Sequence, residues 1–194
     1  MTSPNSPDEE RDSGAVVLLS GPPGVGKSTV ARLLTEAPGE PASAWLHADD
    51  YWAVLGHDAV PPYLPAARHQ NEVVIGVLAR AAAGYAAGGY LTVVDGVIGP
   101  WFVEPFLAET VRALGATPHY VVLRPDRETT LERGTTRPDH PLTDPGPIEA
   151  MYRQFADLGR YERHALDTTG QPPAATADAV RAALASGRCR LPGG

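Results

Sequence analysis

The chain has 194 residues, of which 43% are hydrophobic and 20% are charged, and these proportions are typical of a soluble globular protein. Its length fits one domain with a substantial core. The net charge of −7, without a basic run, does not indicate a nucleic-acid-binding surface, and no apolar run approaches the roughly 18 residues of a membrane-spanning helix.

The two ends of the chain differ from its centre. Residues 1–13 are polar and acidic with two prolines, so we expect a disordered leader rather than a signal peptide. Cys189 is the only cysteine and lies in an expected tail, residues 188–194, so neither an internal disulfide nor a cysteine metal cluster can form. These features are typical of a reducing, cytoplasmic compartment.

The first predicted strand, loop and helix contain the most specific motif. An apolar run at residues 15–20 precedes residues 21–28, which read Gly-Pro-Pro-Gly-Val-Gly-Lys-Ser and fit the phosphate-binding pattern Gly-x4-Gly-Lys-Ser/Thr. Val30, Leu33 and Leu34 then share one face of a helix. The alternative, a glycine-rich turn with a solvated lysine, leaves this strand–loop–helix context unexplained.

Each residue type in this loop has a physical reason. The glycines let backbone N–H groups point at phosphate oxygens, and the start of the helix directs its unpaired N–H groups at the same anion. Lys27, the only lysine in the chain, would reach the β- and γ-phosphates of ATP, and the Ser28 hydroxyl would bind Mg²⁺. The candidate nucleotide-binding residues of this loop are Gly21, Gly24, Val25, Gly26, Lys27, Ser28 and Thr29.

Strands and helices alternate along the rest of the chain. After the first strand, we expect strands at residues 43–48, 90–95, 118–123 and 165–168. After the first helix, we expect helices at residues 69–87, 103–114 (with Pro105 in its first turn), 127–133 (capped by Asp126), about 148–155 and 176–186, with residues 51–68 irregular. This alternation predicts an α/β fold in three layers, with a roughly five-stranded parallel sheet and helices on both faces. It does not give the order of the strands.

Three aspartates follow strands at the carboxyl edge, where ligands bind in such folds. Asp95 ends the mostly apolar run of residues 91–94, as a carboxylate associated with Mg²⁺ would. Asp49 and Asp50 follow the second strand. A cap or turn is the alternative role for each of the three.

Residues 46–52, Leu-His-Ala-Asp-Asp-Tyr-Trp, resemble the strand end of uridine kinases and nicotinamide riboside kinases. In those families an Asp-Asp-aromatic motif supplies the carboxylate that accepts the proton of the substrate hydroxyl. The resemblance makes Asp49 the candidate base, although Asp50 is hard to rank against it. One such carboxylate suits phosphoryl transfer, which otherwise depends on positioning and charge neutralisation.

Residues 130–138, Thr-Leu-Glu-Arg-Gly-Thr-Thr-Arg-Pro, resemble the start of the lid in shikimate kinase and nucleoside monophosphate kinases. In those enzymes one arginine packs near the adenine and a second closes over the phosphates, and here they would be Arg133 and Arg137. The resemblance predicts a mobile lid at about residues 134–147. Two solvated arginines are the alternative.

Residues 160–169 resemble the approach to the last strand in the same small kinases, including chloramphenicol phosphotransferase. The backbone of residues 170–173 would then edge the adenine. Arg160 would either reach the phosphates or be an ordinary helix-end charge. Together, these motifs resemble the P-loop small-molecule kinases, a group that also includes gluconate kinase.

The acceptor region departs from nucleoside monophosphate kinases, because only Arg68 could match their substrate-phosphate arginine. A partly aromatic acceptor pocket is suggested instead, although packing in the core or at its rim explains each aromatic residue equally well. The residues concerned are Tyr51, Trp52, His57, Tyr63, Trp101 and Phe102.

Two other P-loop classes fit less well. A GTPase needs the guanine-reading motif Asn/Thr-Lys-x-Asp, which is impossible in a chain whose only lysine is Lys27. Oligomeric AAA-type ATPases share the Gly-Pro-Pro-Gly start, but they place a water-activating glutamate after the third-strand aspartate. This chain has Gly96 at that position.

The sequence therefore predicts one P-loop kinase domain at residues 14–187. We expect ATP- and Mg²⁺-dependent transfer of the γ-phosphate to a hydroxyl of a small molecule, with Asp49, Lys27 and Arg137 as catalytic residues. Arg133 would contact the nucleotide, and Ser28 and Asp95 would face the metal. A nucleotide-dependent regulatory module without such an acceptor is the second hypothesis, and neither the acceptor nor the oligomeric state follows from the sequence.

Overall fold

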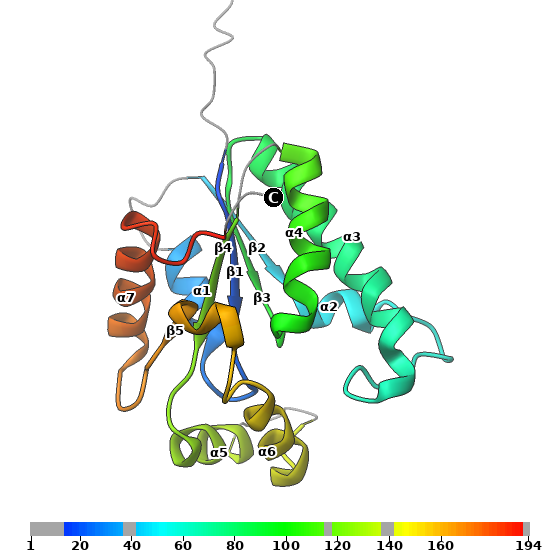
Figure 1. The fold of residues 1–194 in the computed structure, drawn as a ribbon, viewed down its shortest axis with the longest axis vertical. Coiled ribbons are helices and arrows are strands. Elements are labelled where there is room, and N and C mark those ends of the chain that lie inside the picture. Colours follow the sequence, from blue (N-terminus) through cyan, green and yellow to red (C-terminus); the bar gives the residue numbers. More distant parts are fainter. Residues whose placement is uncertain (1–13, 37–41, 115–117, 137–141, 192–194) are drawn as a thin grey trace, which may run out of the picture.

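A parallel sheet with the strand order β2-β3-β1-β4-β5 forms the centre of the molecule (Figure 1). The computed structural model describes residues 14–36, 42–114, 118–136 and 142–191. The strands are β1 (Val16–Ser20), β2 (Ser43–His47), β3 (Leu91–Asp95), β4 (His119–Leu123) and β5 (Ala165–Leu166). The expected five-stranded parallel sheet is confirmed, and its strand order is the part that the alternation of elements left open.

Helices cover both faces of this sheet (Figure 1). Helices α1 and α7 pack together on one face, and α3 and α4 pack together on the other. Helices α5 and α6 lie beyond the carboxyl ends of the strands. The bounds are α1 (Lys27–Thr35), α2 (Ala48–Ala53), α3 (Arg68–Ala87), α4 (Pro100–Leu114), α5 (Arg127–Thr135), α6 (Pro145–Gln154) and α7 (Pro173–Ala185), with short 3₁₀ turns η1 (Pro65–Ala67) and η2 (Gly159–His164).

The side chains of β1 show why the molecule has three layers. Successive residues of a strand point to opposite faces, so Val16 and Leu18 pack with α3 and α4, whereas Val17 and Leu19 pack with α1 and α7. All four side chains are buried. A parallel sheet buried on both faces needs such continuous apolar strands, and the layered fold that the sequence predicts is therefore confirmed.

Four helices differ from the expectations. Helices α6 and α7 begin at Pro145 and Pro173, earlier than the expected starts at residues 148 and 176. Helix α2 forms within the segment expected to be irregular, and its first turn holds Asp49 and Asp50, which suit the positive end of a helix dipole. Helix α4 begins at Pro100 rather than near residue 103, because proline is favoured in a first turn. Pro105 consequently lies inside this helix, on its exposed side.

The C-terminal residues 188–191 are part of the packed structure. The amide of Tyr120 donates to the carbonyl of Cys189 at 2.8 Å, and the amide of Leu191 donates to the carbonyl of Pro118 at 3.0 Å. The side chains of Cys189 and Leu191 are buried. This packing lies beyond the domain end expected at residue 187, because an irregular segment without periodicity gives no sign that it pairs with β4.

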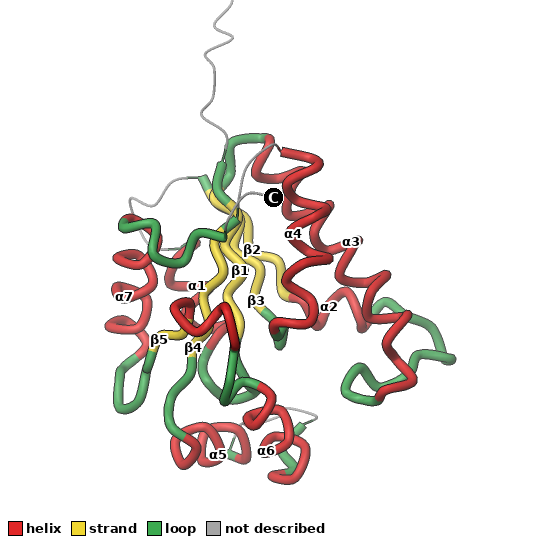
Figure 2. The backbone as a smooth tube through the Cα atoms, in the orientation of Figure 1, coloured by secondary structure: helices red, strands yellow, loops and turns green. Residues whose placement is uncertain are grey.

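The loops that follow β1, β3, β4 and β5 leave the same end of the sheet, the end toward α5 and α6 (Figure 2). Ligands bind at this end in open α/β sheets. The expected leader and the centre of the expected lid, residues 137–141, lie outside the described residues. Within the part of the chain that is described, no helix has the length and apolar character needed to cross a membrane.

Candidate functional site

The loop between β1 and α1 has the backbone of a phosphate-binding loop. Gly21, Gly24 and Gly26 have φ angles of 137°, 87° and 93°, in the left-handed region that side chains disfavour. The loop ends at the first turn of α1, where unpaired N–H groups and the positive end of the helix dipole favour an anion. Val25 is buried in the core, whereas Thr29 is exposed on the first turn of α1.

Lys27 is folded back onto this loop. Its Nζ donates hydrogen bonds to the carbonyl oxygens of Gly21, at 3.0 Å, and Pro22, at 2.9 Å. Only 9% of the residue is exposed. The ammonium group is thus held against the backbone at the start of the loop.

Ser28 and Asp95 meet at the carboxyl ends of β1 and β3. The Ser28 hydroxyl donates to Asp95 Oδ2 at 2.6 Å, and Asp95 is completely buried. Burial alone would raise the pKa of Asp95, but hydrogen bonds from His47, Ser28 and Trp45 outweigh it and hold the pKa below its usual range. Asp95 is therefore ionised at neutral pH.

This pair fits a magnesium ion carried by a nucleotide. Mg²⁺ prefers oxygen ligands and is usually held by one or two carboxylates plus substrate phosphates and water. Among the described residues, no group of three or more His, Cys, Asp or Glu side chains could hold a metal ion by itself. The donor set of Ser28 and Asp95 thus suits a cation that arrives with phosphates, not a permanently bound metal.

Two residues that the sequence analysis did not single out complete the surroundings of Asp95. His47 Nδ1 and Trp45 Nε1 lie 3.0 Å and 2.7 Å from Asp95 Oδ1. The parallel pairing of β2 with β3 places His47 directly beside Asp95. Both residues lie in the predicted strand 43–48, but their contact with Asp95 can be inferred only once β2 and β3 are known to be neighbours.

The two adjacent aspartates of α2 are both exposed but differ in their contacts. His47 Nε2 lies 3.7 Å from Asp49 Oδ2, so the imidazole stands between Asp49 and Asp95. The hydrogen bond to Asp95 raises the pKa of His47, partly offset by burial, and the charges of Asp95, Asp49 and Asp50 act in the same direction as that bond. Of the two candidate bases, Asp49 is the one that the described contacts join to Asp95, through His47.

Helix α5 brings a second glycine against the phosphate-binding loop. A Cβ on Gly24 would lie 2.7 Å from the backbone of Gly134, so the loop and the end of α5 touch at two glycines. The neighbouring Arg133 points its Nη2 at the carbonyl of Gln171, 3.5 Å away, in the loop after β5. Arg133 is therefore beside the segment expected to edge the adenine, whereas Arg137 lies outside the described residues.

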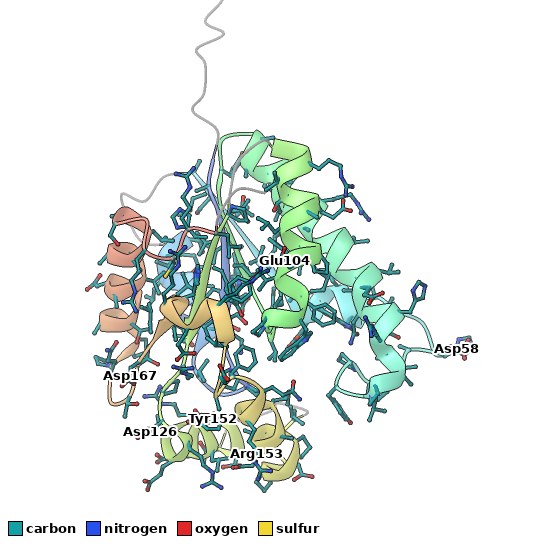
Figure 3. The ribbon with its side chains drawn as sticks, viewed as in Figure 1. Asp58, Glu104, Asp126, Tyr152, Arg153 and Asp167 are labelled. Atoms are coloured by element: carbon teal, nitrogen blue, oxygen red, sulfur yellow. The ribbon has the colours of Figure 1, made fainter. Side chains whose placement is uncertain are left out.

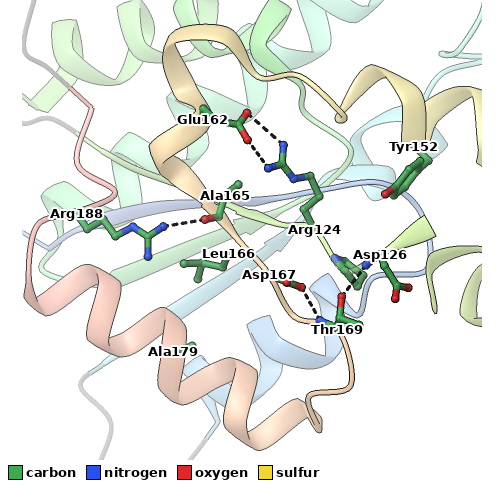
Figure 4. A pocket seen from close by; sticks show the side chains of 11 residues that line it. Arg124, Asp126, Tyr152, Glu162, Ala165, Leu166, Asp167, Thr169, Ala179 and Arg188 are labelled. Atoms are coloured by element: carbon green, nitrogen blue, oxygen red, sulfur yellow. Dashed lines mark hydrogen bonds and ion pairs between the residues drawn. The ribbon is translucent and has the colours of Figure 1, made fainter. Parts of the chain in front are cut away.

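The segments that lead into α5 and out of α6 are tied together. Asp126 caps α5 by accepting a hydrogen bond from the Thr129 amide at 2.8 Å, as expected, and lies at the same end of the molecule as Asp167 (Figure 3). Arg124 donates to the carbonyl oxygens of Phe155 and Ala156 at 3.2 and 3.3 Å. It also forms an ion pair with Glu162 (Figure 4).

A pocket of about 620 Å³ lies at the carboxyl ends of β4 and β5 (Figure 4). None of the predicted site residues within the described part of the chain lines it, although it borders the loop that Arg133 contacts. The pocket is thus adjacent to the loop after β5 and is not lined by the phosphate-binding loop. Its lining residues are Arg124, Pro125, Asp126, Tyr152, Glu162, Ala165, Leu166, Asp167, Thr169, Ala179 and Arg188.

The aromatic residues expected to form an acceptor pocket do not share one environment. Tyr51, Trp52 and Phe102 pack against the core, and His57 is among the exposed residues with Tyr63. The structure therefore does not gather these residues into one lining, because some of them serve the core.

Trp101 and two arginines that the sequence left open have contacts of their own. The Trp101 ring covers Gly99, where a Cβ would lie only 2.2 Å from it, and stacks edge-on with Phe155. Arg68 pairs with Glu72 at 3.0 Å on the exposed surface of α3. Arg160 pairs with Glu104 and lies 4.9 Å from the centre of the Tyr161 ring, so its charge is matched within the protein.

The sheet, the glycine-rich loop and the Ser28–Asp95 pair together define a P-loop protein with a three-layer kinase-type fold. Family comparison agrees: residues 17–153 match the family model described as "AAA domain", and the chain belongs to that family. Comparison with curated proteins gave no match. The family name agrees with the Gly-Pro-Pro-Gly start noted in the sequence.

Solved structures similar to this chain come from several small P-loop proteins. The tunicamycin resistance protein of Deinococcus radiodurans has 21% identity and a TM-score of 0.61, over 93% of this chain and 99% of that chain. A gluconokinase from Sinorhizobium meliloti 1021 has 20% identity and a TM-score of 0.60, over 91% and 94%. The APS kinase of Mycobacterium tuberculosis, in complex with AMPPNP and APS, has 19% identity and a TM-score of 0.61, over 89% and 98%. At these identities the likeness establishes the shared fold, and the expected P-loop kinase fold is confirmed.

Proposed function

We propose that the protein is an ATP-dependent phosphotransferase that moves the γ-phosphate to a hydroxyl of a small molecule. The observation that carries this proposal is the chain of contacts from Ser28 through Asp95 and His47 to Asp49. It joins a carboxylate on the nucleotide side to a carboxylate that could face an acceptor. Such a pairing suits phosphoryl transfer, in which a second carboxylate orients the attacking hydroxyl.

Phosphoryl transfer from ATP to the acceptor hydroxyl needs no third reactant. The acceptor oxygen forms a bond to the γ-phosphorus while the bond from that phosphorus to the β–γ bridging oxygen breaks, and ADP leaves. The hydroxyl proton passes to Asp49. Lys27 and the N–H groups of the loop would bind the phosphate oxygens, and a magnesium ion on the side of Ser28 and Asp95 would neutralise phosphate charge.

The arginines of the lid region would complete this site. Arg133 lies beside the loop after β5, which supports a contact with the adenine. Arg137 would close over the phosphates, as in the kinases that the motif resembles. Closure would exclude water, and the presence of Gly96 where AAA-type ATPases have a water-activating glutamate agrees with transfer to an acceptor rather than hydrolysis.

The partners in this proposal are ATP and one hydroxyl compound in the cytoplasm, without nucleic acid or membrane. The similar structures are named for tunicamycin resistance, for gluconate phosphorylation and for APS phosphorylation. An antibiotic, a sugar acid and a nucleotide therefore belong in an acceptor panel, together with nucleosides and cofactor precursors. The compound that becomes phosphorylated would identify the class of acceptor.

Acceptor-stimulated formation of ADP tests the proposal. Purified protein, ATP and Mg²⁺ would be mixed with pools of acceptors, beside a Lys27→Ala variant. We expect one pool to accelerate ADP formation at least about tenfold over the rate without acceptor, and the variant to show no acceleration. ATP binding without stimulation by any pool would count against the kinase.

The second candidate is a nucleotide-dependent regulatory domain. Membership of the family described as "AAA domain" is the observation that favours it, since that description does not specify an acceptor. This candidate predicts tight ATP binding with slow hydrolysis and no phosphorylated product. A single phosphorylated acceptor would exclude it.

A further inference from the structure

The imidazole of His47 stands between the two carboxylates of the candidate site and has no role in the mechanism above. Its Nδ1 lies 3.0 Å from Asp95 Oδ1, and its Nε2 lies 3.7 Å from Asp49 Oδ2. The pairing of β2 with β3 fixes the first contact, because His47 and Asp95 are register partners in the sheet. The second contact follows from the turn into α2, which begins at the next residue.

The direction of the first hydrogen bond follows from chemistry. An ionised carboxylate only accepts, so His47 Nδ1 carries the proton and donates to Asp95. Trp45 Nε1 donates to the same oxygen at 2.7 Å, from the same face of β2, and Ser28 donates to the other oxygen at 2.6 Å. His47 and Trp45 therefore donate to one oxygen of Asp95 and Ser28 donates to the other, and these three donors fix the plane of the carboxylate.

Asp95 depends on these donors because it is fully buried. A buried charge without hydrogen bonds is unfavourable, and a carboxylate that lost one donor would rotate toward the remaining ones. Rotation would change the orientation of the carboxylate plane relative to Ser28. Hydrogen-bond partners behind a metal-binding carboxylate fix its orientation, and changing them typically lowers metal affinity about 10- to 100-fold.

We propose that His47 is a positioning residue that orients Asp95 toward the nucleotide-bound cation through its Nδ1–H group. This inference rests on the proposed nucleotide binding. It assigns the metal dependence of ATP binding to a residue that contacts neither the nucleotide nor the metal. Loss of the Nδ1 donor should weaken ATP binding in the presence of a divalent cation and leave metal-free binding unchanged.

Two substitutions separate the two nitrogen atoms of the ring. In His47→Asn the side-chain amide nitrogen takes nearly the place of Nδ1, so the bond to Asp95 can persist. In His47→Gln the longer side chain places its amide nearer the position of Nε2, and the bond to Asp95 is lost. His69→Asn, at an exposed histidine in the first turn of α3, is the matched control.

The test is calorimetric titration of ATP into the full chain, once with Mn²⁺ and once with EDTA. The unaltered protein and the control should show the same gain in affinity from Mn²⁺. We expect His47→Asn to keep this gain. In His47→Gln the gain in ATP affinity from Mn²⁺ should be smaller by about tenfold or more, and the affinity in EDTA should be unchanged in both variants.

The other outcomes overturn the inference in distinguishable ways. A full Mn²⁺ gain in His47→Gln, or equal losses in the two variants, would remove the role assigned to Nδ1. A parallel fall in Mn²⁺ and in EDTA would show a structural role only. Failure of the unaltered protein to bind ATP under either condition would instead overturn the proposed function, and this inference with it.

Discussion

Asp49 and Asp50 are neighbours in the first turn of α2, yet only Asp49 has its carboxylate within 4 Å of His47 among the described contacts. If Asp49 accepts the proton of the acceptor, Asp49→Asn should lower kcat about 100-fold or more, the usual contribution of a general base. Asp50→Asn should change it far less. Steady-state kinetics with the acceptor measure this difference.

ATP binding by calorimetry is the control for that experiment. Asp49 lies in α2 and contacts His47, outside the phosphate-binding loop, so both variants should bind ATP as the unaltered protein does. Retained transfer in Asp49→Asn would remove Asp49 from the role of base. A larger loss in Asp50→Asn would move the role to its neighbour.

At the scale of single residues, the site residues that belong to local sequence motifs could be predicted. Lys27 and Ser28 lie at the start of α1, as the P-loop pattern implies, and Ser28 contacts Asp95, the carboxylate expected at the end of the third strand. His47 and Trp45 escaped notice because their importance comes from lateral pairing of β2 with β3. Periodicity along a strand contains no information about which strand lies beside it.

Among the elements, the contact between the phosphate-binding loop and α5 makes a specific prediction. Gly24 and Gly26 both have positive φ, so alanine at either position costs about 1–2 kcal/mol of backbone strain. A Cβ at Gly24 would also meet the backbone of Gly134 at 2.7 Å, whereas a Cβ at Gly26 meets nothing within 4 Å. Urea unfolding should therefore show a larger loss of unfolding free energy for Gly24→Ala than for Gly26→Ala. Equal losses would mean that this contact adds nothing to stability.

The C-terminal segment allows a second test at the scale of elements. Removing residues 188–194 deletes the buried side chains of Cys189 and Leu191 and their backbone hydrogen bonds with Tyr120 and Pro118. Burial of an aliphatic side chain contributes about 1.5–3 kcal/mol, so we expect the unfolding free energy to fall by roughly 3 kcal/mol or more. Removal of residues 192–194 alone is the control. A truncated protein as stable as the control would show that the domain ends at residue 187.

The elements themselves were predictable wherever a pattern extended over several turns or a full strand. Strands β1 to β4 and the long helix α3 follow from such patterns, whereas β5 ends at Leu166 and not at the expected residue 168. Helix α2 did not, because six residues are too few for a period to appear, and its polar first turn resembles a loop. The early start of α4 was missed because Pro100 and Pro105 are both compatible with a helix start.

At the scale of the whole molecule, a buried histidine should make stability depend on pH. His164 is almost completely buried; its Nδ1 lies 2.9 Å from the Tyr120 carbonyl, and Arg163 donates to its Nε2. Burial lowers the pKa of His164, and the charges of Arg163 and Arg188 act in the same direction, although hydrogen bonds to the backbone oppose it. The unfolded chain therefore binds a proton below about pH 6.5 that the folded protein does not, and stability falls as the pH drops through that range.

His164→Asn isolates this contribution, because asparagine can keep the hydrogen bond to Tyr120 but does not titrate. The unfolding free energy of this variant, measured between about pH 5 and pH 7, should decrease less on acidification than that of the unaltered protein. His119 has a pKa shift in the same direction and His47 one in the opposite direction, and both remain in the variant. Identical pH dependence in the two proteins would contradict a neutral buried His164.

The whole fold brings the buried carboxylate of Asp95 and the exposed carboxylate of Asp49 to the same end of a parallel sheet. The central claim is that the two carboxylates serve phosphate transfer. Mass spectrometry of the acceptor panel, with ATP that has a heavy-oxygen label in its γ-phosphate, tests this claim most directly. We predict that one acceptor gains the labelled phosphate with the unaltered protein and none does with Lys27→Ala. If ATP binds and the label appears only in inorganic phosphate across the panel, the protein is not a kinase of these acceptors and the account is contradicted.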